Sequence, residues 1–258
     1  MKRATMICFI ALLVGREAQA VVSLGGTRLV FDGRFREATL DVSNPGSGPV
    51  LIQAWIENPK ADQATPGDLP FVLTPHLAQI IAQGRQTFRV LYEGVGMPQD
   101  RESLLHLYVL EVPRRSHAPQ QMTIAVRQRI NVFYRPKGLD GEPADVPQSL
   151  RWQRSMQDSD VLHVRNPTAF HAALLKITFG GVEIQEDLLL EPFSERSLRL
   201  PEGLKRAVGT GCLHFKALTD YGGQRDFSAL SQDSEPFMAR LHITSGRSSE
   251  PPLLNEKC

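Results

Sequence analysis

The sequence predicts an all-β protein made of two immunoglobulin-like sandwich domains. Short runs rich in β-branched and aromatic residues recur between turn residues, and no long stretch shows an apolar period of 3.6 residues. A chain of 258 residues suits two domains of ordinary size. About seven short strands in roughly a hundred residues are typical of an immunoglobulin-like sandwich, in which Trp55 would anchor the core.

Turn residues separate the expected strands of the first domain, as at Asp32-Gly33, Asn44-Pro45-Gly46 and Pro66-Gly67. These strands are Thr27 to Phe31, Ala38 to Val42, Val50 to Glu57, Gln86 to Tyr92, Leu104 to Val112 and Met122 to Tyr134. The second domain repeats the pattern, with strands at Leu162 to Val164, Ala172 to Phe179, Glu195 to Leu200, Cys212 to Leu218 and Phe237 to Ile243.

The N-terminus has the order of parts found in a secretory signal. Lys2 and Arg3 precede an apolar run from Ala4 to Val14, and Ala18-Gln19-Ala20 supplies a small-residue cleavage site. The alternative is a membrane anchor, but the run is about half of the roughly 20 residues that a span requires. We expect residues 1–20 to be a signal peptide, so that the mature chain begins at Val21.

The remaining chain divides at a polar, proline-bearing stretch that follows Pro136. We expect an N-terminal domain at 21–138, a linker at 139–147 and a C-terminal domain at 148–244. Residues 245–258 have too few apolar side chains to pack, which predicts a disordered tail.

Cysteine use is sparse and leaves one question open. Loss of the signal peptide removes Cys8, so Cys212 and Cys258 are the remaining thiols in an oxidising compartment. The alternating apolar residues that follow Cys212 place it on the opposite, wetter face of its strand. Either a Cys212–Cys258 bridge or free thiols would fit the sequence.

Charge and motifs argue against several classes of function. The 29 Lys and Arg residues nearly balance the 28 Asp and Glu residues, so no global field favours nucleic acid or a membrane surface. No HExxH, GxSxG or GxxxxGK[ST] pattern occurs, and the seven histidines lack metal-ligand spacing. We therefore expect no enzyme activity, no cofactor, no metal site and no small-molecule substrate.

The segment from Gln121 to Pro136 is the most distinctive stretch of the chain. Its alternation places Met122, Ile124 and Val126 on one face of a strand. An exposed apolar row beside unpaired backbone groups invites pairing with another chain, and most proteins avoid it. Such a row suits a protein that lends a strand to a partner. The alternative is that the three residues face the core of their own domain.

Several segments stand out in both domains. They are Val22-Ser23-Leu24 with Thr27 to Phe31, Gln53 to Asn58, Asp100 to Leu104, Phe133-Tyr134-Arg135-Pro136, Arg165-Asn166-Pro167-Thr168 and Asp220-Tyr221-Gly222-Gly223. In this order along the chain, they resemble segments of the periplasmic chaperones of the chaperone-usher pilus pathway. The loop 113–119 is short, as in the short-loop branch of that family. Departures at His106, Tyr108 and Arg114 indicate a divergent member.

The resemblance implies an L-shaped molecule with a cleft between its domains. It also implies a periplasmic chaperone that binds, folds and caps pilus subunits by donor-strand complementation and delivers them to an outer-membrane usher. Self-association through the exposed strand is possible on the same grounds. A second candidate is an exported immunoglobulin-like pilus subunit or adhesin, although a subunit would be expected to lack a strand. The sequence does not identify the subunit, the usher or the type of pilus.

The resemblance also assigns residues. Arg28 matches the family's carboxylate-binding Arg on the first strand, whereas Asn131 stands where the family has a Lys on the last strand of the first domain. Arg129 lies two residues earlier, and we expect it to supply the missing charge unless it is a solvated surface cation. Met122, Ile124 and Val126 match the donor residues. The match to an interdomain ionic network covers Glu102, Arg135 and Asp220, which could otherwise be unrelated surface charges.

Overall fold

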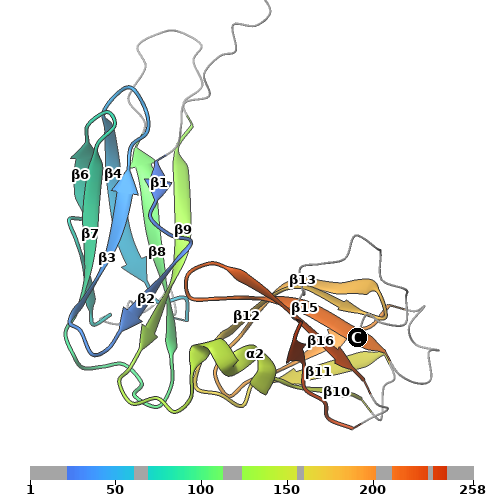
Figure 1. Ribbon diagram of the computed structural model, residues 1–258. Helices are drawn as coiled ribbons and strands as arrows, with labels where there is room; N and C mark the ends of the chain where they lie inside the picture. The colour runs from blue at the N-terminus through green and yellow to red at the C-terminus, as the bar shows by residue number, and fades with distance from the viewer. Residues whose placement is uncertain are drawn as a thin grey trace, which may run out of the picture.

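The structure is a computed structural model that describes residues 22–60, 69–112, 124–155, 160–201, 211–231 and 235–242. Its regular secondary structure is almost entirely strand, arranged as two β-sandwiches (Figure 1). The long axes of the two sandwiches are steeply inclined, so the molecule has the shape of an L (Figure 1). Within the described part of the chain, no helix has the length and apolar character that a membrane span requires.

The first sandwich packs a four-stranded sheet, ordered β1-β3-β7-β5, against a five-stranded sheet, ordered β2-β9-β8-β4-β6. Every pairing is antiparallel except that of β2 with β9. The strands are β1 (Ser23–Leu24), β2 (Arg28–Asp32), β3 (Glu37–Ser43), β4 (Val50–Glu57), β5 (Phe71–Thr74), β6 (Leu77–Ile80), β7 (Arg85–Tyr92), β8 (Ser103–Val112) and β9 (Val126–Arg135).

Alternation along these strands builds the first core. On β8, for example, Leu105, Leu107 and Val109 are buried between less buried neighbours. An aromatic cluster fills the end of the sandwich nearest the second domain, with ring centroids 4.7 to 6.1 Å apart, and consists of Phe31, Phe71, Tyr92 and Tyr134. Burial of each such side chain contributes roughly 1.5 to 3 kcal/mol.

Trp55 is not the anchor of this core, so that prediction was wrong. Because Ile52 and Ala54 point inward on β4, Trp55 points to the outer face of the sheet. There its ring stacks on Tyr108 at 5.2 Å, and its Nε1 donates a 2.7 Å hydrogen bond to Glu57. The alternation of β4 therefore outweighed the general preference of Trp for the interior.

The second sandwich combines a three-stranded sheet, β10-β11-β14, with a five-stranded sheet, β13-β12-β15-β16-β17. Its core has a fully buried Trp of its own, Trp152, whose ring lies 5.4 Å from Phe215. The strands are β10 (Arg151–Arg154), β11 (Val161–Arg165), β12 (Ala172–Phe179), β13 (Val182–Leu190), β14 (Glu195–Arg199), β15 (Cys212–Leu218), β16 (Gln224–Leu230) and β17 (Arg240–Leu241).

The expected linker is partly folded. A 3-10 turn, η2 (Pro143–Asp145), leads into a single helical turn, α2 (Val146–Ser149), that lies against the second domain (Figure 1). Val146 is buried in the core of that domain. The C-terminal part of the expected linker therefore packs on the second domain.

Six strands that the sequence analysis did not predict are present, namely β1, β5, β6, β10, β13 and β16. All except β16 lie at the edge of a sheet. Four of these edge strands are only two to four residues long, which is too short to show a clear alternation, and β13 carries charged residues of the kind that discourage pairing with other chains. The strand expected at Phe237 to Ile243 is reduced to β17 and an isolated bridge between Phe237 and Trp152, within the part of this segment that is described.

Cys212 is half-buried and lies on the face opposite Leu213, Phe215 and Ala217, as the alternation predicts. It is disulfide-bonded, and its partner lies outside the described residues. The expected signal peptide 1–20 and the tail 245–258 also lie outside them.

Candidate functional site

Parallel pairing of β2 with β9 places Arg28 beside Asn131, and the two are partners in the strand register. Arg28 is half-buried, with its guanidinium carbon 5.7 Å from the centre of the Phe133 ring. Burial lowers the pKa of Arg28, while the charges of Asp220 and Glu102 oppose that change. Its inaccessible Nε has no hydrogen-bond partner among the described residues. A half-buried guanidinium with an unused N–H donor is suited to bind an anion.

Arg129 lies on the same outer face of β9 as Asn131, because the alternating residues Ile130 and Val132 are buried on the inner face. It is exposed and pairs in register with Tyr108. Burial and then the positive charge of Arg129 lower the pKa of the neighbouring His106. The two-residue offset from Asn131 corresponds to roughly 7 Å along a strand. The structure therefore brings Arg28 and Asn131 together and leaves Arg129 farther along β9.

A cavity of about 190 Å³ lies where the two sandwiches meet, and Arg28 is part of its wall. Neither Asn131 nor Arg129 lines it. The wall combines charged groups with apolar side chains of both domains, including Phe133, Leu218 and Phe227. Among the described residues, no group of three His, Cys, Asp or Glu side chains is placed to hold a metal ion.

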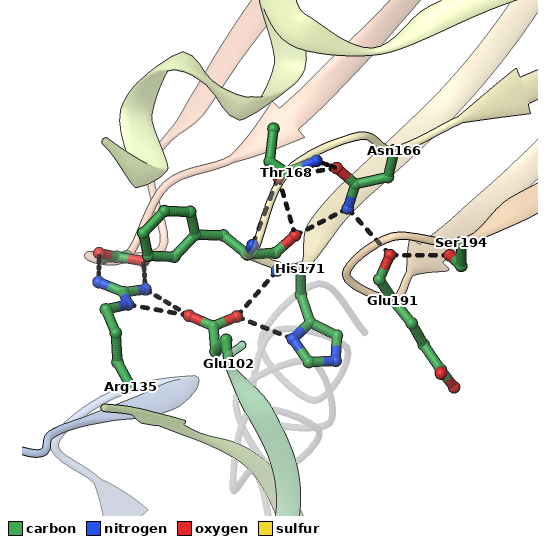
Figure 2. Close-up of polar contacts among 9 residues, drawn as sticks. Glu102, Arg135, Asn166, Thr168, His171, Glu191 and Ser194 are labelled. Atoms are coloured by element: carbon green, nitrogen blue, oxygen red, sulfur yellow. Dashed lines mark hydrogen bonds and ion pairs between the residues drawn. The ribbon is translucent and has the colours of Figure 1, made fainter. Parts of the chain in front are cut away.

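Arg135, the last residue of β9, joins the domains through two carboxylates (Figure 2). Its Nε and Nη2 donate to Glu102 Oε2 at 2.9 and 2.7 Å, and its Nη1 and Nη2 donate to Asp220 at 2.9 and 3.2 Å. Burial alone would lower the pKa of Arg135, but its hydrogen bonds to Asp220 and the charges of both carboxylates raise it. Such a network fixes orientation more than it adds stability, because desolvation offsets much of the attraction.

The turn between β15 and β16 presents Asp220 to Arg135. Gly222 closes this turn with φ of +79°, and its N–H donates to Thr219 at 3.0 Å. A side chain at position 222 would be strained by that φ and would approach Thr27 of the first domain to 3.1 Å. The glycine thus allows the turn to lie close against β2.

The candidate donor residues are only partly described. Met122 and the loop 113–119 lie outside the described residues, whereas Ile124 is 67% exposed and Val126 begins β9 half-buried. The β8–β9 register runs without a shift from Glu111 opposite Val126 to Ser103 opposite Tyr134. Because no bulge intervenes, the even-numbered donor row and the odd-numbered row of Arg129 and Asn131 lie on opposite faces.

Within the described part of the chain, one edge of β9 is unpaired along the strand's first half. β8 pairs with β9 from Val126 to Tyr134, but β2 pairs with it only from Asn131 to Arg135. A groove follows the remaining edge, lined by residues 22–27 and 128–130. A side-chain bond from Gln128 Nε2 to the carbonyl of Val22, 2.8 Å long, crosses it. The backbone there can pair with another strand if the hydrogen bond from Gln128 to Val22 breaks.

Two family models together match most of the chain. One, described as "Pili and flagellar-assembly chaperone, PapD N-terminal domain", matches residues 21–140. The other, "Pili assembly chaperone PapD, C-terminal domain", matches residues 145–229. This chain belongs to the pilus-assembly chaperone family. The match covers both domains of the chaperone, which excludes a pilus subunit or adhesin as its family.

Curated relatives agree with this assignment. The chaperone is 35% identical over 230 residues to chaperone protein FimB/FhaD of Bordetella pertussis, covering 84% of this chain and 90% of the relative. It is 31% identical over 235 residues to the probable fimbrial chaperone YadV of Escherichia coli, covering 86% and 95%. These relatives are chaperones, which places the protein in a class that is not enzymatic in general.

Solved structures agree as well. A structure of the SafA pilin of Salmonella enterica in complex with the SafB chaperone matches with a TM-score of 0.68 and 29% identity, covering 88% of this chain and 99% of that one. The YadV chaperone structure matches with a TM-score of 0.67 and 28% identity, covering 81% and 99%.

Sequence reasoning missed one member of the network in the chaperone, His171. Glu102 Oε1 accepts a 2.9 Å hydrogen bond from the backbone N–H of His171 and lies 2.8 Å from its Nδ1 (Figure 2). The backbone N–H of Glu102 donates to the carbonyl of Ala169 at 2.8 Å. The His171 side chain is only 5% exposed. Its position in the segment after Asn166-Pro167-Thr168 was the one available signal.

The Asn166 motif shapes this segment of the chaperone. Fully buried Asn166 donates through Nδ2 to the carbonyls of Phe170 and Glu191, at 2.7 and 2.9 Å, and its Oδ1 accepts from Thr168 (Figure 2). An Asn that bonds the backbone in this way imposes a local turn. The turn carries His171 and Ala169 to Glu102.

Two further contacts cross between the domains of the chaperone. Lys60 Nζ lies 2.6 Å from Glu191 Oε2, and the Arg101 guanidinium carbon lies 5.2 Å from the Phe193 ring centre. Both contacts are solvent-exposed, where an ion pair contributes roughly 0 to 1 kcal/mol. They therefore add little energy to the interface between the domains.

Proposed function

We propose that this chaperone binds the C-terminal segment of a pilus subunit, with the terminal carboxylate on Arg28 and the segment paired along the free edge of β9. One observation carries the proposal: a half-buried arginine without an ion pair among the described residues lies at the point where the free edge of β9 ends. The complex of SafB with a pilin, a structure similar to this chain, supports the same kind of partner.

The donor row would act in the same complex. Ile124 and Val126, preceded by Met122, would insert into the groove that a subunit leaves open where it lacks a strand. Each side chain buried there would contribute roughly 1.5 to 3 kcal/mol. Ile124 is exposed in the free protein, so it is available for this contact.

Glu102, Arg135 and Asp220 would keep the two domains oriented around the bound terminus. We also propose that removal of residues 1–20 releases the chaperone into the periplasm, from which it delivers subunits to an outer-membrane usher. The terminal domains would span 21–138 and 148–244, joined by 139–147.

The test compares two forms of one peptide. A synthetic peptide that copies the C-terminal strand of a pilus subunit is prepared as the free acid and as the C-terminal amide, and its Kd for the mature chain is measured by fluorescence anisotropy. We expect the acid to bind at least tenfold more tightly, the scale of one charge-assisted hydrogen bond. Equal affinity would show that the carboxylate is not the bound group.

A further inference from the structure

The charged groups around the interdomain cavity do not balance. Three arginines line it, Arg28, Arg135 and Arg225, against two carboxylates, Glu102 and Asp220. Arg135 hydrogen-bonds to both carboxylates. His171 also lines the cavity, with its Nδ1 directed to Glu102. With a neutral imidazole, the wall keeps an excess of one positive charge, which a single carboxylate would neutralise.

Of the three arginines, Arg225 is the one that belongs to the second domain. It lies on β16 just after the turn that carries Asp220, and its register partner is Ala217. Its neighbour Asp226 is engaged elsewhere, in a 2.8 Å ion pair with Lys216. No ion pair of Arg225 occurs within the described residues, so its guanidinium is available to a ligand.

Apolar side chains make up much of the remaining wall. Ala173 and Leu218 both adjoin the Leu174–Ala217 register pair, and Phe133 faces them from the first domain. Charge interactions are stronger where few waters compete. A carboxylate that enters this cavity would therefore gain more from half-buried Arg28 than from an arginine on an open surface, while Arg225 is exposed on β16.

We propose that Arg225 is the second cationic anchor, so that Arg28 and Arg225 bind one C-terminal carboxylate between the two domains. This inference rests on the proposed function of Arg28. A carboxylate has about four lone-pair sites, enough to accept hydrogen bonds from both guanidinium forks. The family places both of its cations on the first domain, whereas here Asn131 has no charge and Arg225 replaces it from the facing domain. Ligand binding would then bridge the domains.

The experiment uses the acid and amide forms of the subunit peptide described above. Arg225→Gln should weaken binding of the acid by about tenfold or more, the scale of a hydrogen bond to a charged group, and leave binding of the amide unchanged. Arg225→Lys should restore part of the loss. Arg240→Gln removes an exposed arginine of β17 that does not line the cavity and serves as the matched control.

Three outcomes would overturn the inference. If Arg225→Gln binds the acid like the unmodified chain while Arg28→Ala does not, Arg28 acts without Arg225. If Arg129→Gln shows the acid-specific loss and Arg225→Gln does not, the second charge belongs to Arg129. If Arg225→Gln weakens acid and amide equally, Arg225 does not contact the carboxylate. Failure of the proposed function is separate, because it requires that Arg28→Ala also leave binding of the acid unchanged.

Discussion

Arg28 and Asn131 lie side by side across the parallel pairing of β2 and β9. The first provides a half-buried positive charge, and the second provides an amide in place of a second charge. This pair lies at the end of the free edge of β9, so the register between two strands from opposite ends of the first domain defines the candidate anchor. The predictions below test this site and the structure that supports it.

Arg28→Ala should abolish recovery of a complex with a co-expressed pilus subunit and leave the fold intact. Truncation of a strand-surface side chain rarely costs much stability, whereas the carboxylate would lose its charged partner. Affinity co-purification measures the complex, and thermal unfolding checks the fold. Arg34→Ala, at an exposed arginine paired with Asp32, is the control. A normal complex yield from folded Arg28→Ala protein would remove Arg28 from the site.

Asn131→Lys should tighten binding of the acid peptide and rescue the Arg225→Gln variant. A lysine beside Arg28 would add an ammonium donor where the amide now lies. Anisotropy titrations of the single and double variants measure the effect. Weaker binding by the single variant would mean that the site has no room for a second cation on β9.

Ile124→Asp should fold normally and fail to hold a pilus subunit. The side chain is 67% exposed in the free chaperone, but in the complex the new charge would be buried without a partner. Circular dichroism and complex yield separate the two effects. Ile130→Asp, on β9 and 5% exposed, should unfold the first domain. Loss of fold in Ile124→Asp would place Ile124 in the chaperone's own core.

Glu102→Gln should destabilise the interface between the domains. The Glu102 side chain is 2% exposed and accepts bonds from Arg135 and His171, so its neutralisation leaves a partly buried arginine less compensated. Breaking such a pair costs roughly 3 to 5 kcal/mol. We expect a lower Tm and an altered small-angle scattering profile. Asp100→Asn, at an exposed ion pair, should change neither.

Stability should fall between about pH 10 and 12 through Tyr92. Burial, with a further effect of the neighbouring Tyr134, raises the pKa of Tyr92 to about 12, above the ordinary value near 10. Because the folded state holds this proton more tightly, the stabilisation is present below pH 10 and is lost as the pH rises to about 12. Thermal melts across this range should show a shallower decline for Tyr92→Phe. An unchanged slope would assign the alkaline transition to other groups.

The sequence alone was sufficient for the class of fold, because alternating apolar residues and turn signals report strands locally. It also indicated Arg28, Glu102, Arg135 and Asp220, through motifs that lie within short segments. It did not reveal which face of β4 is covered, and Trp55 was misplaced for that reason. Alternation distinguishes two faces of a strand but does not say which one meets the opposite sheet.

Only the tertiary structure decided the composition of the site. Arg135 and Asp220 are 85 residues apart in the chain, and His171 lies 69 residues from Glu102, so no local pattern joins them. The register of β2 with β9 brings Asn131 to Arg28, and the turn at Gly222 brings the second domain close to Thr27, next to Arg28. Arg225 becomes a candidate ligand for the same reason: a cavity formed by two domains depends on packing between distant segments, which the order of residues does not specify.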